Sequence, residues 1–229
     1  KFDNNDDFIA RHGFLLAVAD GIGGDPGGLE ASCMALTELD KQYYSNASHN
    51  KNLSDVKAAL YASIKKANSK VLEFQLRMPE MSKAATTLTG ICVRNQSFYY
   101  FNLGDSRVYR LRKNALEQLT QDDTWVQSAI AEGMAKNEAH ATLGNCLNNF
   151  IGINEPDLKI TVSNEIDFED EDFILVCSDG IYGLIDDKDI ERLLKNNSDL
   201  DSMVRTITDQ ALVNGGRDNL SIILLKYNR

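Results

Sequence analysis

The sequence predicts an α+β fold in which layers of helices cover antiparallel sheets. Two observations lead to this fold class. Strand-like segments are joined by turns that are too short for a parallel crossover, and helix-like segments are grouped in separate blocks. No linker rich in glycine, serine or proline divides the 229 residues. A chain of this length can enclose one core, so residues 1–229 are expected to form a single domain.

The predicted strands are short runs rich in β-branched, aromatic and aliphatic residues. Two of them, Phe14–Ala19 and Phe173–Cys177, are continuously apolar, and each is followed closely by an Asp-Gly pair. The remaining strands are expected at Thr86–Val93, Ser97–Leu103, Ser106–Leu111 and Leu220–Lys226.

The predicted helices have apolar residues three or four positions apart. The clearest is Ser54–Leu76, where one apolar stripe should face the core. That stripe consists of Val56, Leu60, Ile64, Ala67, Val71 and Phe74. The other helices are expected over Glu30–Tyr44, Thr124–Glu132, Lys188–Lys195 and Ser202–Asn214.

The composition excludes several classes of partner. Acidic residues outnumber basic ones 34 to 24, giving a net charge of -10. Nucleic acids and anionic membranes attract basic surfaces, so neither is expected to be a partner. No apolar run approaches the ~18–20 residues that cross a bilayer. The four cysteines are scattered without a Cys-x-x-Cys pair, which favours reduced thiols in a cytoplasmic protein. Because the chain begins at Lys1, it is interpreted as a trimmed or incomplete segment.

Aspartates recur at the ends of the predicted strands. Asp20 and Asp179 follow apolar strands, Asp105 lies in a hairpin turn, Asp218 opens the last strand, and Asp6 precedes the first. Each one alone is explained as a turn or cap residue. Because neighbouring antiparallel strands bring opposite ends together, all of these except Asp6 are expected to share one edge.

Carboxylates gathered at one edge repel each other unless cations lie between them. A set of oxygen ligands without histidine or cysteine favours hard ions such as Mg²⁺ or Mn²⁺. Gly21 and Gly180, each beside an aspartate, would let a backbone carbonyl approach a cation closely. The histidines His12, His49 and His140 lie beside no plausible nucleophile and are predicted to be surface residues.

Six segments, in order and spanning nearly the whole chain, carry a family resemblance. They are VADGIGGDPGGLEAS (18–32), TTLTGICV (86–93), NLGDSRVYRLR (102–112), LTQDDT (119–124), LVCSDGIYGLI (175–185) and GGRDNLSIILL (215–225). Together they resemble the PPM, or type 2C, metal-dependent serine/threonine protein phosphatases in their bacterial form. The resemblance implies an α-β-β-α sandwich, two antiparallel sheets flanked by helix layers, and a single phosphatase catalytic domain.

The resemblance also implies a role for each aspartate. Asp20 would bridge two cations, with the Gly21 carbonyl on one of them, and Asp179 and Asp218 would complete the other. These three aspartates are the candidate catalytic residues. Asp105 would serve a third, weaker cation.

The opening segment KFDNNDDF resembles the family pattern Arg-x-x-Asn-Glu-Asp-x-Phe. This match makes Asp6 a further ligand, acting through water, whereas shifting it by one residue favours Asp7. Lys1 then stands where the family has a phosphate-binding arginine, and a lysine offers a point charge without a bidentate fork. Arg107 is predicted to be a structural ion-pair partner.

Further departures from the family pattern fall around the segment 122–152, which in the family forms a mobile flap over the site. Asn102 and Asp123 replace histidines that are frequent in bacterial members, and Thr142-Leu143 replaces His-Pro. Ile22 stands where eukaryotic members have a histidine. Substrate preference therefore stays open.

The implied function is hydrolysis of phosphoserine and phosphothreonine in proteins, with two cations activating a water for in-line attack. The expected partners are phosphorylated proteins and a serine/threonine kinase in the same signal transduction pathway, and the expected state is a monomer. One alternative is a phosphatase fold kept as an inactive or weakly active binding module, which the presence of Asp20, Asp179 and Asp218 disfavours. Another is a phosphatase dedicated to one regulatory partner, which the motifs GDSR and GRDN disfavour.

Overall fold

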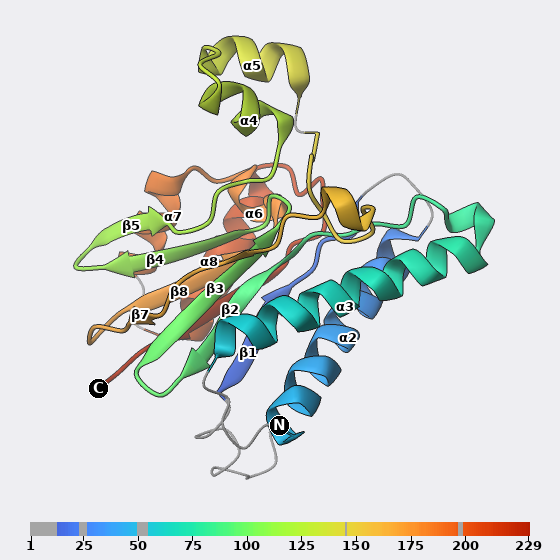
Figure 1. Cartoon of the computed structure of the whole chain (residues 1–229). Coiled ribbons are helices and arrows are strands. Elements are labelled where there is room, and N and C mark those ends of the chain that lie inside the picture. The colour runs from blue at the N-terminus through green and yellow to red at the C-terminus, as the bar shows by residue number, and fades with distance from the viewer. Residues whose placement is uncertain (1–12, 23–26, 50–54, 145, 197–198) are drawn as a thin grey trace.

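Two antiparallel sheets stack face to face in the computed structural model (Figure 1). The structure describes residues 13–22, 27–49, 55–144, 146–196 and 199–229. The first sheet has the order β1-β2-β3-β6, with β7 also paired to β3, and the second has the order β5-β4-β8-β9. The strands are β1 (Phe14–Val18), β2 (Leu88–Arg94), β3 (Ser97–Leu103), β4 (Arg107–Arg112), β5 (Ala115–Gln118), β6 (Thr161–Val162), β7 (Ile166–Asp167), β8 (Phe173–Cys177) and β9 (Ile222–Lys226).

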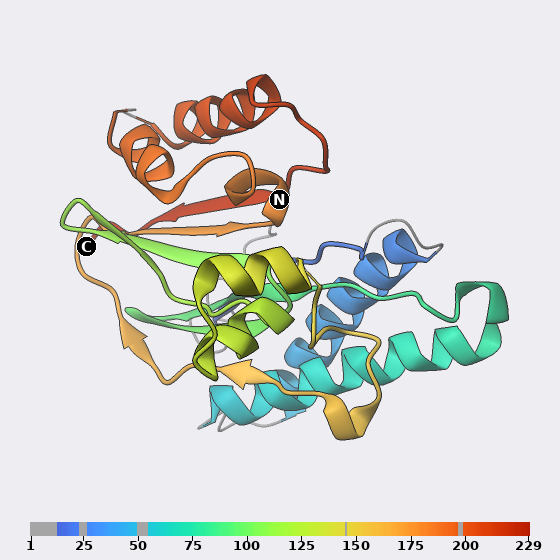
Figure 2. The ribbon, with the colours of Figure 1, turned by 90° about the horizontal axis from the view of Figure 1, so that it is seen from above.

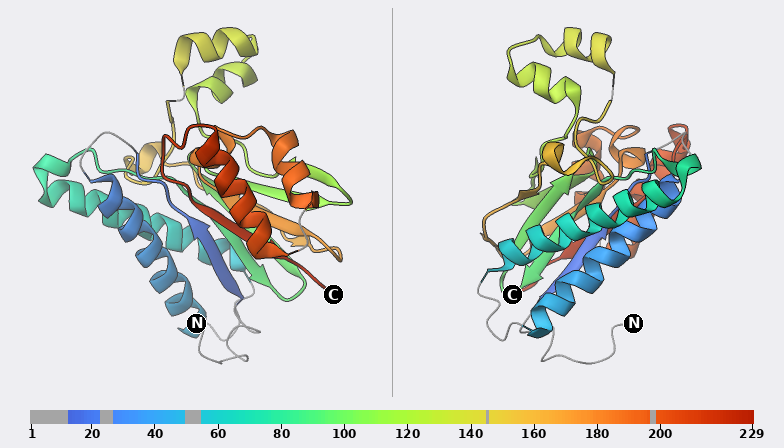
Figure 3. Two further views of the ribbon diagram at one scale, coloured as in Figure 1. Left: turned by 180° about the vertical axis from the view of Figure 1, so that it is seen from behind. Right: turned by 45° about the vertical axis from the view of Figure 1, so that its right-hand side comes forward.

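Helices cover the outer face of each sheet (Figures 1 and 2). Helices α2 (Gly28–His49) and α3 (Val56–Arg77) pack on the first sheet. The short helix α6 (Asp179–Tyr182), α7 (Asp187–Asn196) and α8 (Leu200–Val213) pack on the second sheet. In the view from behind (Figure 3, left), α7 and α8 lie on the side of that sheet that faces the viewer. The predicted stripe of α3 is confirmed: its first five residues are buried, and Phe74 packs against them.

A third apolar cluster lies between the sheets and completes the α-β-β-α sandwich. Its buried members include Val18 of β1, Ile91 of β2, Phe98 of β3, Val108 of β4 and Val176 of β8. The two sheets cover each other's inner faces, and the helices cover the outer faces. Strands β1 and β8 therefore have apolar neighbours on both sides, which accounts for their continuously apolar sequences. The predicted fold class is therefore confirmed.

The helices α4 (Trp125–Ala131) and α5 (Lys136–Leu143) stand apart from these layers, at the top of Figure 1. The chain leaves the sandwich and returns to it at adjacent points, because Thr124 pairs with Leu147 in an isolated bridge. The amide of Trp125 also donates to the carbonyl of Cys146 at 3.0 Å. The first of these helices is predicted, at Thr124–Glu132, whereas α5 is missed.

Two differences from the predicted strands, one shifted boundary and one missed strand, have a local cause. Strand β2 begins at Leu88 instead of Thr86, because the backbone of Thr86 bridges to Gly21 on one side and to Ile151 on the other. The hairpin between β4 and β5 turns through Lys113 and Asn114, both at positive φ, and its second strand is not predicted. In the described residues, every helix is too short or too polar to span a lipid bilayer.

Candidate metal centre

Four of the predicted aspartates lie near one another at one end of the sandwich. Asp20 follows β1, Asp105 lies between β3 and β4, Asp179 opens α6 directly after β8, and Asp218 precedes β9. Asp179, Asp218 and Asp105 all act electrostatically on the Asp20 carboxyl. The site therefore draws on both sheets, since Asp20 belongs to the first and Asp179 and Asp218 to the second.

Asp20 is fixed through its backbone by the two threonines that precede β2. Its amide donates to Thr87 Oγ1 at 2.9 Å, and its carbonyl accepts from the Thr87 amide at 2.8 Å. The Thr86 hydroxyl donates to the same carbonyl at 2.9 Å. The Thr87 hydroxyl also contacts the Ser106 hydroxyl at 2.8 Å, which ties this segment to the Asp105 turn. Side-chain hydrogen bonds therefore hold the site where the strand ladder has ended.

Asp179 and Asp218 are brought together by the pairing of β8 with β9. Just beyond the paired residues, the Ser178 amide donates to the Ser221 carbonyl at 3.0 Å, and the Ser221 amide donates to Ser178 Oγ at 3.1 Å. A Cβ at Gly180 would lie 2.4 Å from the Asn219 carbonyl oxygen, so only glycine lets the two segments approach this closely.

Asp105 is held in its turn by contacts with both sheets. Gly104 has φ +101°, and a Cβ there would lie 2.7 Å from the Thr87 side chain. The Tyr182 hydroxyl donates to the Asp105 carbonyl oxygen at 2.9 Å. Arg107, as predicted, is an ion-pair partner: its Nε and Nη2 donate to the two carboxylate oxygens of Asp122 at 2.9 and 2.7 Å.

The electrostatics of this cluster fit a bound cation. Burial raises the pKa of the Asp20 carboxyl from 3.8 to about 7, and the nearby carboxylates of Asp179, Asp218 and Asp105 add to the rise. Burial and the carboxylate of Asp179 raise the pKa of Asp105 to about 6. Asp179 Oδ1 is buried without a hydrogen-bond partner among the described residues. A divalent cation would relieve the repulsion and give that oxygen a ligand role.

The described residues do not form a complete ligand shell. No group of three or more histidine, cysteine, aspartate or glutamate side chains within them is arranged to hold a metal ion. Lys1, Asp6 and the alternative Asp7 lie outside the described residues. Gly21 lies within the described residues, and its backbone pairs with that of Thr86. Oxygen ligands from waters or from the N-terminal segment would complete the coordination.

Asp123, one of the residues that depart from the family pattern, connects the base of the α4–α5 excursion to the Asp105 turn. Its Oδ2 accepts from the Gly104 amide at 3.1 Å and from Asn149 Nδ2 at 2.7 Å. Burial raises the pKa of its carboxyl, although both hydrogen bonds oppose the rise. Asp123 also lines a polar cavity of about 600 Å³ together with Tyr100, Asp122 and Thr161.

Sequence reasoning missed several residues of this site. The Thr86-Thr87 pair lies in a recognised segment, but nothing in the sequence shows that its hydroxyls hold Asp20 and Ser106. Nothing in the sequence points to Tyr182. His140 is exposed on α5, as predicted.

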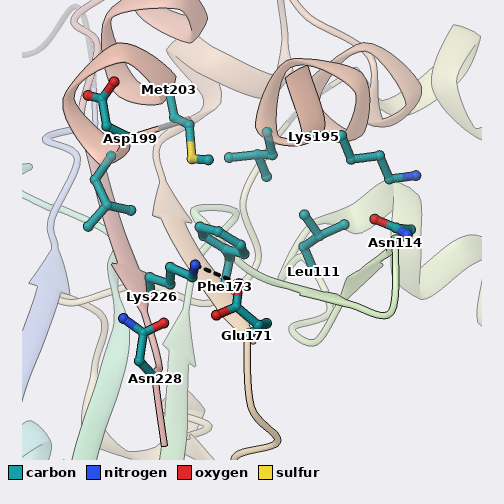
Figure 4. A pocket seen from close by; sticks show the side chains of 11 residues that line it. Leu111, Asn114, Glu171, Phe173, Lys195, Asp199, Met203, Lys226 and Asn228 are labelled. Atoms are coloured by element: carbon teal, nitrogen blue, oxygen red, sulfur yellow. Dashed lines mark ion pairs between the residues drawn. The ribbon is translucent and has the colours of Figure 1, made fainter. Parts of the chain in front are cut away.

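A second cavity, of about 470 Å³, lies between the second sheet and the helices α7 and α8 (Figure 4). Leu111 and Phe173 from the second sheet and Met203 from α8 supply apolar lining, and Lys226 Nζ pairs with a Glu171 carboxylate oxygen at 2.6 Å. None of the predicted site residues within the described ranges lines it. Both of its lysines are paired, Lys195 with Glu191 and Lys226 with Glu171, and the cavity is separate from the aspartate cluster.

Known proteins with similar sequences are bacterial phosphatases. The serine/threonine protein phosphatase PstP of Mycobacterium tuberculosis is 30% identical over 223 residues, which cover 96% of this chain and 42% of that protein. The serine/threonine phosphatase Stp of Listeria welshimeri is 27% identical over 217 residues, covering 93% of this chain and 84% of that protein. The chain thus spans less than half the length of PstP.

Solved structures agree with this. A crystal structure of M. tuberculosis PstP has a TM-score of 0.80 at 29% identity, covering 94% of this chain and 88% of that one. The catalytic domain of PstP in complex with two manganese ions has a TM-score of 0.76 at 29% identity, covering 92% and 86%. The S. agalactiae serine/threonine phosphatase has a TM-score of 0.82 at 26% identity, covering 94% and 87%.

Residues 3–224 match the family described as Protein phosphatase 2C. This match takes in every described aspartate of the cluster. The chain therefore belongs to the protein phosphatase 2C family.

Proposed function

We propose that the chain is a manganese- or magnesium-dependent phosphatase that hydrolyses phosphoserine and phosphothreonine in proteins. The observation that carries this proposal is the aspartate cluster. In it a buried, unpaired oxygen of Asp179 lies beside the carboxyls of Asp20 and Asp105, whose pKa values are raised by burial and by neighbouring carboxylates. Similarity to PstP, whose catalytic domain has been solved with two manganese ions, supports the same cofactor.

The residues that would hold the ions are those the family resemblance assigns. Asp20 would serve both ions, the Gly21 carbonyl one of them, and Asp179 and Asp218 the other, and Asp6 would add a further contact through water. When bound, the ions supply an activated water and neutralise charge that develops on the phosphoryl oxygens. Asp105 would hold a third, weaker ion.

The chain's own contribution is to fix these ligands in advance. The hydrogen bonds from Thr86 and Thr87 leave the Asp20 backbone little freedom, and Gly180 lets the Asp179 and Asp218 segments meet. Ligands that are held in place before substrate binds need little reorganisation during the reaction. Lys1 would contact the phosphate of the substrate, as a point charge.

We infer that residues 1–229 act as one catalytic domain, that the protein works as a monomer in the cytoplasm, and that it opposes a serine/threonine kinase in a signalling pathway. All four cysteines are free thiols, which suits a reducing compartment. An inactive binding module would have no reason to keep three mutually repelling aspartates at one edge.

The test is hydrolysis of a phosphothreonine peptide by the whole chain. Activity should be lost with chelator and restored by Mn²⁺ or Mg²⁺. Asp179→Asn should abolish turnover and leave the fold intact, whereas Asp209→Asn, which removes the same charge from an exposed position on α8, should not change it. Full turnover in chelator, or near-normal turnover of Asp179→Asn, would overturn the proposal.

A further inference from the structure

We propose that Tyr182 is a positioning residue that fixes the Asp105 turn against the Asp179 turn and thereby sets the cation affinity at Asp105. The inference rests on the proposed function, in which Asp105 is a ligand of the weaker ion. Tyr182 is the last residue of α6, the single helical turn that Asp179 opens. Its hydroxyl donates to the Asp105 carbonyl oxygen at 2.9 Å.

This hydrogen bond lies where the strand pairing has ended. The ladder between β4 and β8 ends at the pair of Arg107 with Cys177. Asp105 and Asp179 lie beyond that pair, so no ladder hydrogen bond fixes the distance between them. The Tyr182 hydroxyl spans this gap, because its own residue belongs to the Asp179 helix and its acceptor belongs to the Asp105 turn.

The Tyr182 ring is held from one side by Arg107. The guanidinium carbon of Arg107 lies 3.6 Å from the ring centroid, a cation–π contact. Arg107 is itself fixed, because Asp122 accepts two hydrogen bonds from it and its Nη1 donates to the Tyr109 hydroxyl at 2.8 Å. A ring stacked on an immobile guanidinium keeps its hydroxyl aimed at one acceptor.

Tyr109 provides a matched control within the same network. Its buried hydroxyl accepts from Arg107 and donates to Asp187 Oδ1 at 3.0 Å, and neither hydrogen bond reaches Asp105. Removing this hydroxyl costs the network two hydrogen bonds, and removing the hydroxyl of Tyr182 costs only the one to Asp105. If the role of Tyr182 were purely structural, Tyr109→Phe would therefore lower the melting temperature and weaken Mn²⁺ binding more than Tyr182→Phe does.

The experiment compares Mn²⁺ binding by calorimetry for the wild-type chain, Tyr182→Phe, Tyr109→Phe and Asp105→Asn. Phenylalanine keeps the ring against Arg107, so Tyr182→Phe is expected to fold, and melting temperatures check this. We expect Tyr182→Phe to weaken the weakest Mn²⁺ site about fivefold, equivalent to about 1 kcal/mol. It should also raise the Mn²⁺ concentration for half-maximal activity by a larger factor than it lowers kcat. Tyr109→Phe should melt at a lower temperature and bind Mn²⁺ as the wild type does.

The outcomes separate this inference from the proposed function. If Asp105→Asn loses the weakest site and Tyr182→Phe retains wild-type affinity there, the role of Tyr182 is wrong and the metal role of Asp105 stands. If Tyr109→Phe weakens the site as much as Tyr182→Phe does, the effect comes from general loosening and the inference fails. If Asp105→Asn binds Mn²⁺ like the wild type, the assignment of Asp105 is wrong, and the inference falls with it.

Discussion

Replacing Asp20 by asparagine should stabilise the metal-free protein, even though it should abolish activity. The Asp20 carboxyl is partly buried beside three other carboxyls, and together these effects raise its pKa from 3.8 to about 7. A group with a raised pKa holds its proton more tightly in the folded chain than in the unfolded chain. Ionisation of Asp20 therefore destabilises the fold progressively as the pH rises from about 3.8 to about 7, and the full penalty is present above that range.

The size of the effect follows from the pKa difference. The rise from 3.8 to about 7 corresponds to about 4 kcal/mol at ~1.4 kcal/mol per pKa unit. Solvent reaches part of the side chain and asparagine relieves the charge without restoring full hydration, so we expect about 2–4 kcal/mol. For a chain of this size that gain raises the melting temperature by on the order of 10 °C. An asparagine amide can also donate a hydrogen bond to the unpaired oxygen of Asp179.

The assay is thermal unfolding of the wild type and Asp20→Asn in chelator at pH 7.5 and at pH 4. The gain should be present at pH 7.5 and absent at pH 4, where the wild-type carboxyl is largely protonated in the folded chain. With saturating Mn²⁺ the order should reverse, because the wild type gains binding energy that the variant cannot. Asp209→Asn controls for the change in net charge. A metal-free Asp20→Asn that melts below the wild type at pH 7.5 would refute the reasoning.

Three further predictions concern substrate binding, chemistry and stability. Lys1→Ala should raise KM for phosphopeptides more than it lowers kcat, and an unchanged KM would mean that Lys1 does not contact phosphate. Because Ile22 cannot donate a proton, kcat for a series of small phosphate esters should fall steeply as the leaving-group pKa rises. A flat series would have one of two causes: another acid, with Asp123 or His140 next in line, or a rate limited by a step other than P–O cleavage. Asp123→Asn and His140→Ala separate them, because only loss of a true acid makes the flat series steep. Arg107→Lys should lower the free energy of unfolding in urea by about 1–3 kcal/mol, because lysine cannot form both hydrogen bonds to the buried Asp122, and an unchanged midpoint would contradict this.

The fold was largely predictable because its strands and main helices carry strong local patterns. The continuous apolar run Phe173–Cys177 and the stripe of α3 each follow directly from which faces are buried. The position of each aspartate next to a predicted strand also indicated which strand end carries it. Antiparallel pairing then made their meeting at one edge a geometric expectation.

The missed features have no periodic signal. Helix α6 is a single turn, and β6 and β7 are two residues each, so none is long enough for alternation to show. Helix α5 is mostly exposed and has one buried residue, Ala139, so it lacks an apolar stripe. The contacts of Thr87 with Ser106 and of Tyr182 with Asp105 join residues far apart in the chain. Such contacts depend on the three-dimensional approach of segments, which no local pattern encodes.

The pairing of Thr124 with Leu147 has a consequence for how such a protein can change over evolutionary time. Because the chain leaves and re-enters the sandwich at neighbouring points, the α4–α5 excursion can be lengthened, shortened or exchanged without moving the strands. Loops whose two ends lie close together tolerate insertions and deletions at little thermodynamic cost. New surface can therefore be acquired there, while the segments that carry the aspartates keep their positions.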